Sequence, residues 1–431
     1  MIARPLSVKV PGDKSIAHRT LMIAALAPGE SMIVGLPEAA DVRSTATALA
    51  ELGVLVEWPA GSGRAVVTPP AAWPDRMVTL DCGNSGTSAR LLTGLVAGLG
   101  LSARIDGDAS LRSRPMDRVV YPLQAMGARI TYAGASDRLP VEVEARASGN
   151  LRVLRYRSRV SSAQVKSALV LAAVGAGIEF EMWDPGRSRD HTERLLEHVG
   201  VPLTFGPDGK GAHLRLEAGS RARLRSLDVQ IPGDPSSAAF LLGAGLLRGR
   251  SVTVDSLLLN PTRTGFLDVL EEMGADIEMV IQDEWAGEPV GSVSVSPGPL
   301  HGVRIEESQI PGLVDEIPLI AVLAAIARGE TRISGAGELR LKESDRLAAL
   351  AENLAAIGGT VEEMPDGLTI AGDPDLVPRG SVRTHGDHRI AMAFGAMSVV
   401  TGSNLDFDDP ACVAVSYPKF WEACAVVGEA A

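Results

Sequence analysis

Six short polar turns, each followed by a run of small apolar residues, hold most of the side chains that are suited to chemistry. They are centred on Lys14 in PGDKSIAHR, Asn84 in CGNSGTSAR, Ser162 in RVSSAQVKSA, Asp234 in IPGDPSSAAF, Asp315 in LVDEIPLIAV and Asp387 in HGDHRIAMAF. Ser, Thr, Asp and Asn are preferred N-cap residues, so every turn predicts a helix start. The free N–H groups and the positive dipole end of such a start bind anions. The pattern indicates an anion-binding protein, although capping alone explains any single turn about equally well.

Basic side chains accompany several of these turns. Lys14 and Arg19 share the first turn, Arg112 and Arg114 lie in a loop that ends at Pro115, and Arg189 follows the third turn. Guanidinium and ammonium groups at such positions suit phosphate and carboxylate ligands. The first turn does not match the GxxxxGK[ST] pattern of a P-loop. For each basic residue taken alone, a solvated surface position is the usual alternative.

Two carboxylates are candidates for proton transfer. Asp315 lies in the otherwise apolar run 313–327, and apolar surroundings raise a carboxyl pKa towards the range used in acid–base catalysis. A helix cap explains Asp315 equally well. Glu343 lies in LKESDR, whose dense charges are also typical of a salt-bridged exposed helix. His385 and His388 are three residues apart, but because no cysteine or third histidine is near in sequence, we expect no metal site.

The turns belong to a longer repeat that must position them. Between 38 and 43 residues after each turn, a helix end runs through glycine into a β-branched, alternating segment; these glycines are Gly53, Gly127, Gly200, Gly274, Gly358 and, more weakly, Gly428. Glycine supplies the left-handed conformation that ends a helix. Each unit therefore predicts a strand, turn, helix, strand, helix and strand. Three units form each of two domains, with the seam near 230–234.

Composition limits the class of protein. The chain has 431 residues, 45% hydrophobic and 22% charged, which is typical of a soluble protein with two or more domains. Its net charge of −12 argues against a nucleic-acid surface. Three cysteines lie far apart without a CxxC motif, so a reducing compartment is favoured. The N-terminus has no signal-like apolar segment and no apolar run is long enough for a membrane span, so we expect a cytoplasmic protein without membrane partners.

Together, and in order along essentially the whole chain, the motifs PGDKSxxHR, GNSGT, RP, SAQVKSA, LKESDR and DHR resemble the 5-enolpyruvylshikimate-3-phosphate synthase (3-phosphoshikimate 1-carboxyvinyltransferase) family. The resemblance implies an α/β (α+β) enolpyruvyl transferase fold of two domains, each with three βαβαββ units in a pseudo-threefold arrangement. It places one domain at 13–230 and the other at 1–12 with 231–431, with the active site in the cleft between them.

The resemblance also implies the reaction. The enolpyruvyl group of phosphoenolpyruvate is transferred to the 5-hydroxyl of shikimate 3-phosphate by addition and elimination through a tetrahedral intermediate, and phosphate is released. This is a step of aromatic amino-acid biosynthesis in the shikimate pathway. The implied enzyme is a monomer that needs no cofactor or metal, and glyphosate inhibits many family members by occupying the phosphoenolpyruvate site.

The site residues follow from the matched motifs. Asp315 accepts the 5-hydroxyl proton, Glu343 transfers a proton at the methylene carbon, and Lys14 contacts both substrates. The shikimate 3-phosphate set is Lys14, Ser15, Arg19, Ser162, Gln164, Arg189, Asp315 and Lys342. The phosphoenolpyruvate set is Lys14, Gly86, Arg114, Gln164, Arg346 and Arg389, supported by Asn84, Asp387 and His388.

Three positions depart from the family pattern, and two rival functions stand beside it. Ala17 and Ala163 replace hydroxyl residues found in many relatives, and Val415 stands where some carry a lysine.

The related UDP-N-acetylglucosamine enolpyruvyl transferases typically carry a reactive cysteine in the loop that corresponds to 107–116, and this loop has none. A non-catalytic anion-binding repeat protein has no reason to hold both Asp315 and Glu343.

Overall fold

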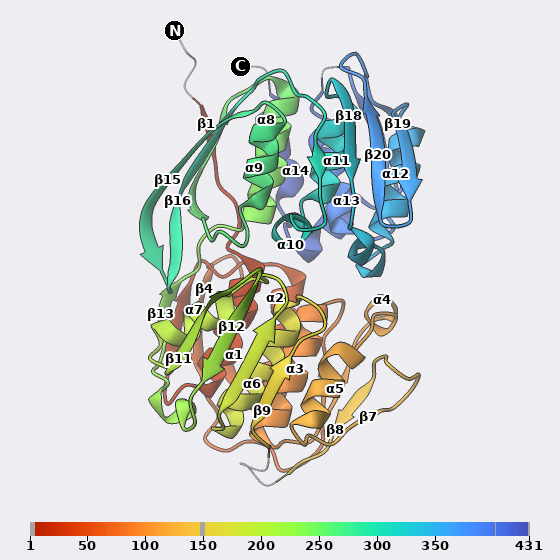
Figure 1. The fold of residues 1–431 in the computed structure, drawn as a ribbon. Coiled ribbons are helices and arrows are strands. Elements are labelled where there is room, and N and C mark those ends of the chain that lie inside the picture. The colour runs from red at the N-terminus through yellow and green to blue at the C-terminus, as the bar shows by residue number, and fades with distance from the viewer. Residues whose placement is uncertain (1–4, 147–150, 401, 430–431) are drawn as a thin grey trace. The chain divides into compact units, whose positions relative to one another are not determined.

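The structure is a computed structural model that describes residues 5–146, 151–400 and 402–429 (Figure 1). The chain divides into two compact units. Unit 1 comprises Met1–Pro11, Pro232–Glu284 and Pro289–Ala431, and unit 2 comprises Gly12–Ile231 with Trp285–Glu288. The segment that forms unit 2 is thus inserted between two segments of unit 1.

Unit 2 contains three four-stranded sheets. Their strand orders are β13 (Asp228–Gln230), β2 (Ser31–Val34), β4 (Arg64–Thr68), β3 (Leu55–Glu57); β5 (Val78–Asp81), β6 (Ala103–Asp106), β8 (Val141–Val143), β7 (Ile130–Tyr132); and β11 (Leu203–Asp208), β12 (Gly211–Leu216), β10 (Phe180–Asp184), β9 (Leu154–Arg157). The helices are α1 (Lys14–Leu26), α2 (Ala40–Glu51), α3 (Gly86–Leu99), α4 (Ala109–Arg112), α5 (Asp117–Ala125), α6 (Ala163–Ala176), α7 (His191–His198) and the 3-10 helix η1 (Ser220–Arg223).

Unit 1 contains two four-stranded sheets and one two-stranded sheet. Their orders are β1 (Leu6–Val8), β14 (Val252–Leu258), β16 (Glu288–Ser296), β15 (Asp276–Trp285); β17 (Arg304–Ile305), β18 (Gly329–Ile333), β20 (Gly367–Gly372), β19 (Thr360–Met364); and β21 (Arg379–Val382), β22 (Asn404–Phe407). The helices are α8 (Pro235–Arg248), α9 (Gly265–Glu272), α10 (Ile310–Leu313), α11 (Ile317–Ala325), α12 (Arg346–Ala356), α13 (His388–Met397), α14 (Phe420–Gly428), η2 (Gly337–Leu341) and η3 (Pro410–Val415).

The predicted repeat is present with two corrections. In every four-stranded sheet one parallel pair is followed by an antiparallel hairpin, as in β5–β6 and β8–β7. The first five repeat glycines adopt φ of +87°, +97°, +87°, +103° and +94°. Gly428 is instead the last residue of α14, and no strand follows it within the described chain. The sixth unit therefore departs from the pattern, and its sheet, β21–β22, has two strands.

The second correction concerns the helix starts. Five of the six turns cap their helices through Asp13, Ser85, Ser162, Asp234 and Asp387, whose side chains accept backbone N–H groups. The fifth turn does not, because α11 begins after Glu316 without a side-chain cap. Asp315 lies in the turn between α10 and α11, so helix capping does not explain it.

Small residues let the central helices of each unit pack at very short range. A Cβ at Gly94 of α3 would lie 2.0 Å from the carbonyl oxygen of Ala168 in α6, and one at Gly98 would lie 2.4 Å from that of Ala172. In unit 1, all residues of α11 and α13 are buried. This is expected of α11, which is apolar on every side, whereas α13 also buries His388 and Arg389 in its first turn. This packing brings the first turns of neighbouring helices together. Among the described residues, no helix is both long and apolar enough to span a membrane.

Candidate active site

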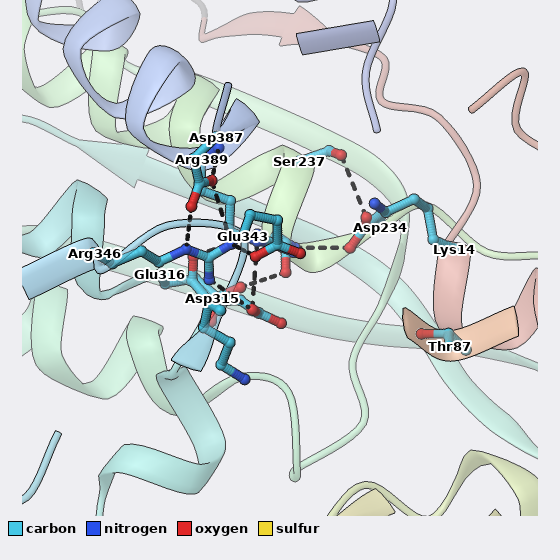
Figure 2. Close-up of polar contacts among 12 residues, drawn as sticks. Lys14, Thr87, Asp234, Ser237, Asp315, Glu316, Glu343, Arg346, Asp387 and Arg389 are labelled. Carbon is cyan, nitrogen blue, oxygen red and sulfur yellow. Dashed lines mark hydrogen bonds and ion pairs between the residues drawn. The ribbon is translucent and has the colours of Figure 1, made fainter. Parts of the chain in front are cut away.

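The clearest ionic cluster of unit 1 surrounds Arg346, the first residue of α12. Its side chain is 1% exposed, and its guanidinium donates to Asp387 Oδ2 at 2.8 Å through Nε and to Glu343 Oε2 at 2.5 Å through Nη2. Nη1 reaches Asp315 Oδ1 at 3.5 Å (Figure 2). Burial alone would lower the pKa of Arg346, but the carboxylates of Asp387, Glu343 and Asp315 outweigh it and raise the pKa far above its ordinary value. The LKESDR segment is therefore no exposed salt-bridged helix.

A second guanidinium approaches Asp315 from α13. Arg389 Nε lies 3.4 Å from Asp315 Oδ1, and its Nη1 donates to the Asp315 carbonyl oxygen at 3.3 Å. The apolar residues that follow Asp315 in sequence belong to α11 and pack into the core. Its neighbours in space are cationic, so the expectation of apolar surroundings for this carboxylate is wrong.

A buried network that sequence reasoning missed holds the turn of Asp315 in place. Glu316 is fully buried and accepts a short hydrogen bond from Ser236 at the start of α8. Arg263 Nη2 donates to Ser236 Oγ and to Asp234 Oδ1, each at 3.0 Å. The first turns of α8 and α11 are thereby joined, and Arg389 adds the first turn of α13. Asp234 was recognised as a turn residue, but nothing in the sequence paired it with Arg263.

The other predicted residues of unit 1 differ in their contacts, and of these only Asp387 belongs to the Arg346 cluster. Asp387 is fully buried and caps α13, accepting from Arg389 N at 2.9 Å. His388 is buried at the start of the same helix. Lys342 lies 3.7 Å from Glu338 and is not brought into the Arg346 cluster by any ion pair of the described residues. His385 is exposed and interacts with Glu352 at 2.9 Å, so the two histidines point to different environments.

In unit 2, the turn before α3 meets the loop after α4. Arg114 Nη2 donates to Asn84 Oδ1 at 2.6 Å, and Asn84 Nδ2 donates to Asp108 Oδ2 at 2.7 Å. Gly86 lies beside both basic side chains of this region, because a Cβ there would lie 2.7 Å from Arg90 Nη1 and 3.4 Å from Arg114 Nη1. A side chain at position 86 would therefore displace the Arg90 guanidinium but would leave Arg114 at an ordinary contact distance.

Arg90 is the last residue of the turn GNSGTSAR, of which the family motif covers only GNSGT, and the sequence pattern assigned it no role. Its Nη1 donates to Gln164 Oε1 at 2.8 Å, and Gln164 Nε2 donates to Thr87 Oγ1 at 3.1 Å. The first turns of α3 and α6 are thus joined, with Gly86 and Arg114 alongside. This arrangement presents two arginines, an amide and helix N–H groups together, which suits a phosphate or carboxylate ligand.

The first turn of unit 2 is organised around α1. Lys14 is half-buried, and its Nζ lies 2.9 Å from Asp41 Oδ2. Arg19 is 2% exposed and donates to the carbonyl of Ser15 at 2.7 Å. It also donates to Ser167 Oγ of α6 at 2.8 Å, so α1 is tied to α6. Ala17 is fully buried, which places this departure from the family pattern in the core.

The third turn lies opposite the loop that follows β10. Ser162 caps α6, and the neighbouring Ser161 Oγ is buried without a hydrogen bond among the described residues. The loop carries Arg189, which is half-buried. A Cβ at Gly186 of this loop would lie 2.7 Å from Ser161 Oγ, so the loop and the turn are in direct contact.

One group in unit 2 has the spacing of a metal site. One ligand atom each from Asp190, His191 and Glu288 lie within 4.8 Å of one another. Arg194 Nε already lies 3.0 Å from Asp190 Oδ2 and 3.7 Å from Glu288 Oε2, and His191 Nδ1 interacts with Glu288 Oε1 at 2.7 Å. A guanidinium in this place supplies the positive charge that a cation would bring, so the group is better explained as an ion-pair cluster.

His18 gives a prediction for the pH dependence of stability. Burial, with the charges of Lys14 and Arg19, lowers the pKa of His18 to about 3, while Nδ1 interacts with Thr45 Oγ1 at 2.7 Å. Below about pH 6.5, His18 binds a proton in the unfolded chain but not in the folded chain, so protonation stabilises the unfolded state. His18 therefore leaves the free energy of unfolding unchanged above pH 6.5 and lowers it as the pH falls below that value.

We expect His18→Gln to reduce the loss of unfolding free energy between pH 7.5 and pH 5 by about 2 kcal/mol, measured by urea denaturation. The matched variant His385→Gln changes an exposed histidine and should leave this loss nearly unaltered. Equal slopes for wild type and His18→Gln would contradict a neutral His18.

Comparisons with known proteins identify the family of this chain. The family described as EPSP synthase (3-phosphoshikimate 1-carboxyvinyltransferase) matches residues 6–424. The chain is 48% identical to the 3-phosphoshikimate 1-carboxyvinyltransferase of Anaeromyxobacter sp. (strain K), over 96% of this chain and 92% of that protein. It is 45% identical to the protein of the same name from Synechococcus sp. (strain CC9605), over 96% and 93%.

Solved structures give the same result for the fold. The EPSP synthase of Acinetobacter baumannii superposes with a TM-score of 0.82 at 35% identity, covering 98% of this chain and 96% of that chain. The enolpyruvyl transferase NikO of Streptomyces tendae has a TM-score of 0.77 at 17% identity, covering 99% and 96%, and supports the fold alone. The enolpyruvyl transferase fold predicted from the sequence is confirmed, and this chain belongs to the EPSP synthase family.

Proposed function

We propose that this chain transfers the enolpyruvyl group of phosphoenolpyruvate to the 5-hydroxyl of shikimate 3-phosphate and releases phosphate. The observation that carries the proposal is the cluster of unit 1, where two arginines hold Asp315 and one of them also holds Glu343. Addition to the enol phosphate of phosphoenolpyruvate requires a base for the attacking hydroxyl and an acid for the methylene carbon. Membership in the EPSP synthase family supports the same reaction.

Within unit 1, Asp315 is proposed to accept the 5-hydroxyl proton of shikimate 3-phosphate. Glu343 is proposed to deliver a proton to the methylene carbon during addition and to take one from the resulting methyl group during elimination. Arg346 and Arg389 present forked donors for the carboxylate or phosphate of phosphoenolpyruvate. Asp387 fixes Arg346 through two contacts, at 2.8 and 3.3 Å. Lys342 is proposed to bind shikimate 3-phosphate, and His388 supports the start of α13.

Within unit 2, the proposed phosphate contacts of shikimate 3-phosphate are Ser162, Gln164 and Arg189 near the start of α6. Ser15 and Arg19 complete that set at the start of α1. Gly86 and Arg114, supported by Asn84, are proposed to bind phosphoenolpyruvate, and Arg90 joins this set because it holds Gln164. Lys14 is proposed to contact both substrates. We propose that residues of both units act on the same pair of substrates.

The further proposals concern the setting of the enzyme. We propose that the enzyme is a cytoplasmic monomer. We also propose that it requires neither metal nor cofactor, because arginines and helix N-termini supply the positive charge that balances phosphate and carboxylate.

The test is a phosphate-release assay on the purified full-length chain. With shikimate 3-phosphate and phosphoenolpyruvate in metal-free buffer containing EDTA, we expect steady release of one phosphate for each 5-enolpyruvylshikimate 3-phosphate formed. UDP-N-acetylglucosamine in place of shikimate 3-phosphate serves as the matched control and should give no release. Turnover only with the nucleotide sugar, or none with either acceptor, would refute the proposal.

Gly86 gives a prediction for inhibition by glyphosate. Because Gly86 leaves room beside Arg90 and Arg114, we expect glyphosate to compete with phosphoenolpyruvate in the wild type. In Gly86→Ala the new Cβ would lie 2.7 Å from Arg90 Nη1, so the guanidinium must shift. We expect the glyphosate inhibition constant to rise about tenfold or more and the KM of phosphoenolpyruvate to rise less, measured by steady-state kinetics. An unchanged inhibition constant would contradict this placement.

A further inference from the structure

A buried lysine lies one turn into α6, directly below the residues proposed to bind the phosphate of shikimate 3-phosphate. Lys166 is 2% exposed on a helix whose other buried residues are small or aliphatic. Its ammonium group lies 2.7 Å from Glu193 Oε1 and donates to the carbonyl oxygen of Ser188 at 3.2 Å. Asp184 Oδ2 lies 4.0 Å away. These partners all belong to the segment from the end of β10 to the first turn of α7.

These contacts fasten the loop 185–190 at several points. Asp184, the last residue of β10, accepts a short hydrogen bond from Ser188 Oγ and a second from Gly186 N at 3.2 Å. Glu193 lies in the first turn of α7, after the loop. Lys166 therefore contacts the residue before the loop, a carbonyl inside it and a residue behind it. Arg189, proposed to bind the phosphate, is next in sequence to the Ser188 carbonyl that Lys166 holds.

The loop also meets the turn before α6. Gly186 lies so near Ser161 that a Cβ would be 2.7 Å from the serine Oγ and 2.9 Å from its Cβ. A shift of the loop would therefore change the distance between Arg189 and the N-terminus of α6. That distance determines whether one phosphate can contact both.

The burial of the Lys166 ammonium group requires an explanation, because removing it from water costs free energy. Buried ion pairs rarely add net stability over apolar residues of the same volume. Glu193 is 2% exposed, and its Oε2 has no hydrogen bond among the described residues, so Lys166 is the cation beside an otherwise unfavourable carboxylate. Such a group is more readily explained by the specific geometry that it imposes than by stability.

We propose that Lys166 is a positioning residue that holds the loop 185–190, and with it Arg189, against the start of α6, so that the phosphate of shikimate 3-phosphate finds both in place. The inference rests on the proposed function. It predicts that loss of this tether, the contacts of Lys166 with Asp184, Ser188 and Glu193, weakens binding of shikimate 3-phosphate and leaves binding of phosphoenolpyruvate nearly unchanged.

The main variant is the double substitution Lys166→Met with Glu193→Gln, which removes both charges and leaves no unpaired carboxylate at position 193. We expect the KM and the calorimetric Kd of shikimate 3-phosphate to rise about 10- to 100-fold, because small misplacements of binding groups have effects of this size. The KM of phosphoenolpyruvate and kcat should change less than threefold. Hydrogen exchange at the amides of residues 186–189 should accelerate.

Leu171→Ala is the matched control, because Leu171 is fully buried on the same helix but lies beyond the first turns. It should lower stability without a split between the two KM values. If the double variant does not fold, Ser188→Ala replaces it, since it removes the bond to Asp184 with little change in volume and should give a smaller split in the same direction.

The outcomes separate the two proposals. Equal changes in both KM values, or the same split in Leu171→Ala, would overturn the role of Lys166. Unchanged hydrogen exchange in the loop would overturn it as well, whatever the substrate. A wild-type enzyme that neither binds nor turns over shikimate 3-phosphate would instead refute the proposed function, and loop exchange would still report on the tether.

Discussion

Asp315→Asn is expected to lower kcat by about 10²- to 10⁴-fold, the usual contribution of a positioned general base. The substitution keeps the size of the side chain and one oxygen for Arg389, which lies 3.4 Å from Asp315 Oδ1. It removes the capacity to accept the hydroxyl proton. The KM values should change much less than kcat, because the amide still fills the turn between α10 and α11.

Steady-state and single-turnover kinetics measure this effect, and the loss should appear in the chemical step. Asp276→Asn, on the exposed face of β15, is the control for loss of a carboxylate in the same unit. A kcat within threefold of wild type for Asp315→Asn would remove Asp315 from the catalytic role.

The role of Glu343 in proton transfer can be distinguished from that of Asp315 by isotope exchange. If Glu343 exchanges protons with the methyl group of the intermediate, turnover in D₂O should place deuterium in the methylene group of the product. Glu343→Gln should slow both turnover and this incorporation. Turnover and deuterium incorporation at rates within threefold of wild type in Glu343→Gln would indicate another proton donor.

Arg346→Met is expected to damage both stability and substrate binding. The variant leaves Asp387, which is fully buried, next to Glu343 and Asp315 without the guanidinium that lies among them. Removing one partner of a buried ion pair costs about 3–5 kcal/mol, which corresponds to a fall in Tm of about 6–20 °C for a unit of this size. The kcat/KM for phosphoenolpyruvate should fall by at least about 100-fold, because a charged contact is lost.

Thermal unfolding and steady-state kinetics test the two parts of this prediction separately. Arg383→Met removes an exposed arginine whose side chain is 70% exposed and pairs with Glu352, so it should change Tm by no more than about 2 °C. Arg346→Lys keeps the charge but not the fork, and we expect an intermediate loss of stability and of kcat/KM. A stable and active Arg346→Met variant would contradict the role of the cluster.

Local rules account for what could be predicted from the sequence. A glycine after a helix end can be recognised because its left-handed conformation is a local property, and five such glycines were identified correctly. The caps Asp13 and Ser162 are local in the same sense. The prediction of a strand after Gly428 was wrong because a helix that ends at glycine does not require a strand after it.

The partners within the site are not local, and this is why they were missed. Arg90 and Gln164 are 74 residues apart, and Ser236 and Glu316 are 80 apart. Asp315 was expected among apolar neighbours because its sequence neighbours are apolar, yet α11 directs those side chains into the core. The arginines that surround Asp315 come from α12 and α13, and no local pattern relates them to it.

The pairing of β1 has a consequence for the order in which the protein folds. Leu6 of β1 pairs with Val252 of β14, while the chain between them contains the whole segment 12–231 of unit 2. At about 5–20 residues per second, a ribosome that has made β1 needs roughly 12–50 s more to make its partner. During that interval unit 2 can complete its sheets, since β13 at its end pairs with β2 near its start. β1, the first strand to be synthesised, is thus among the last to pair. Its length of three residues limits the number of backbone groups that stay unpaired until then.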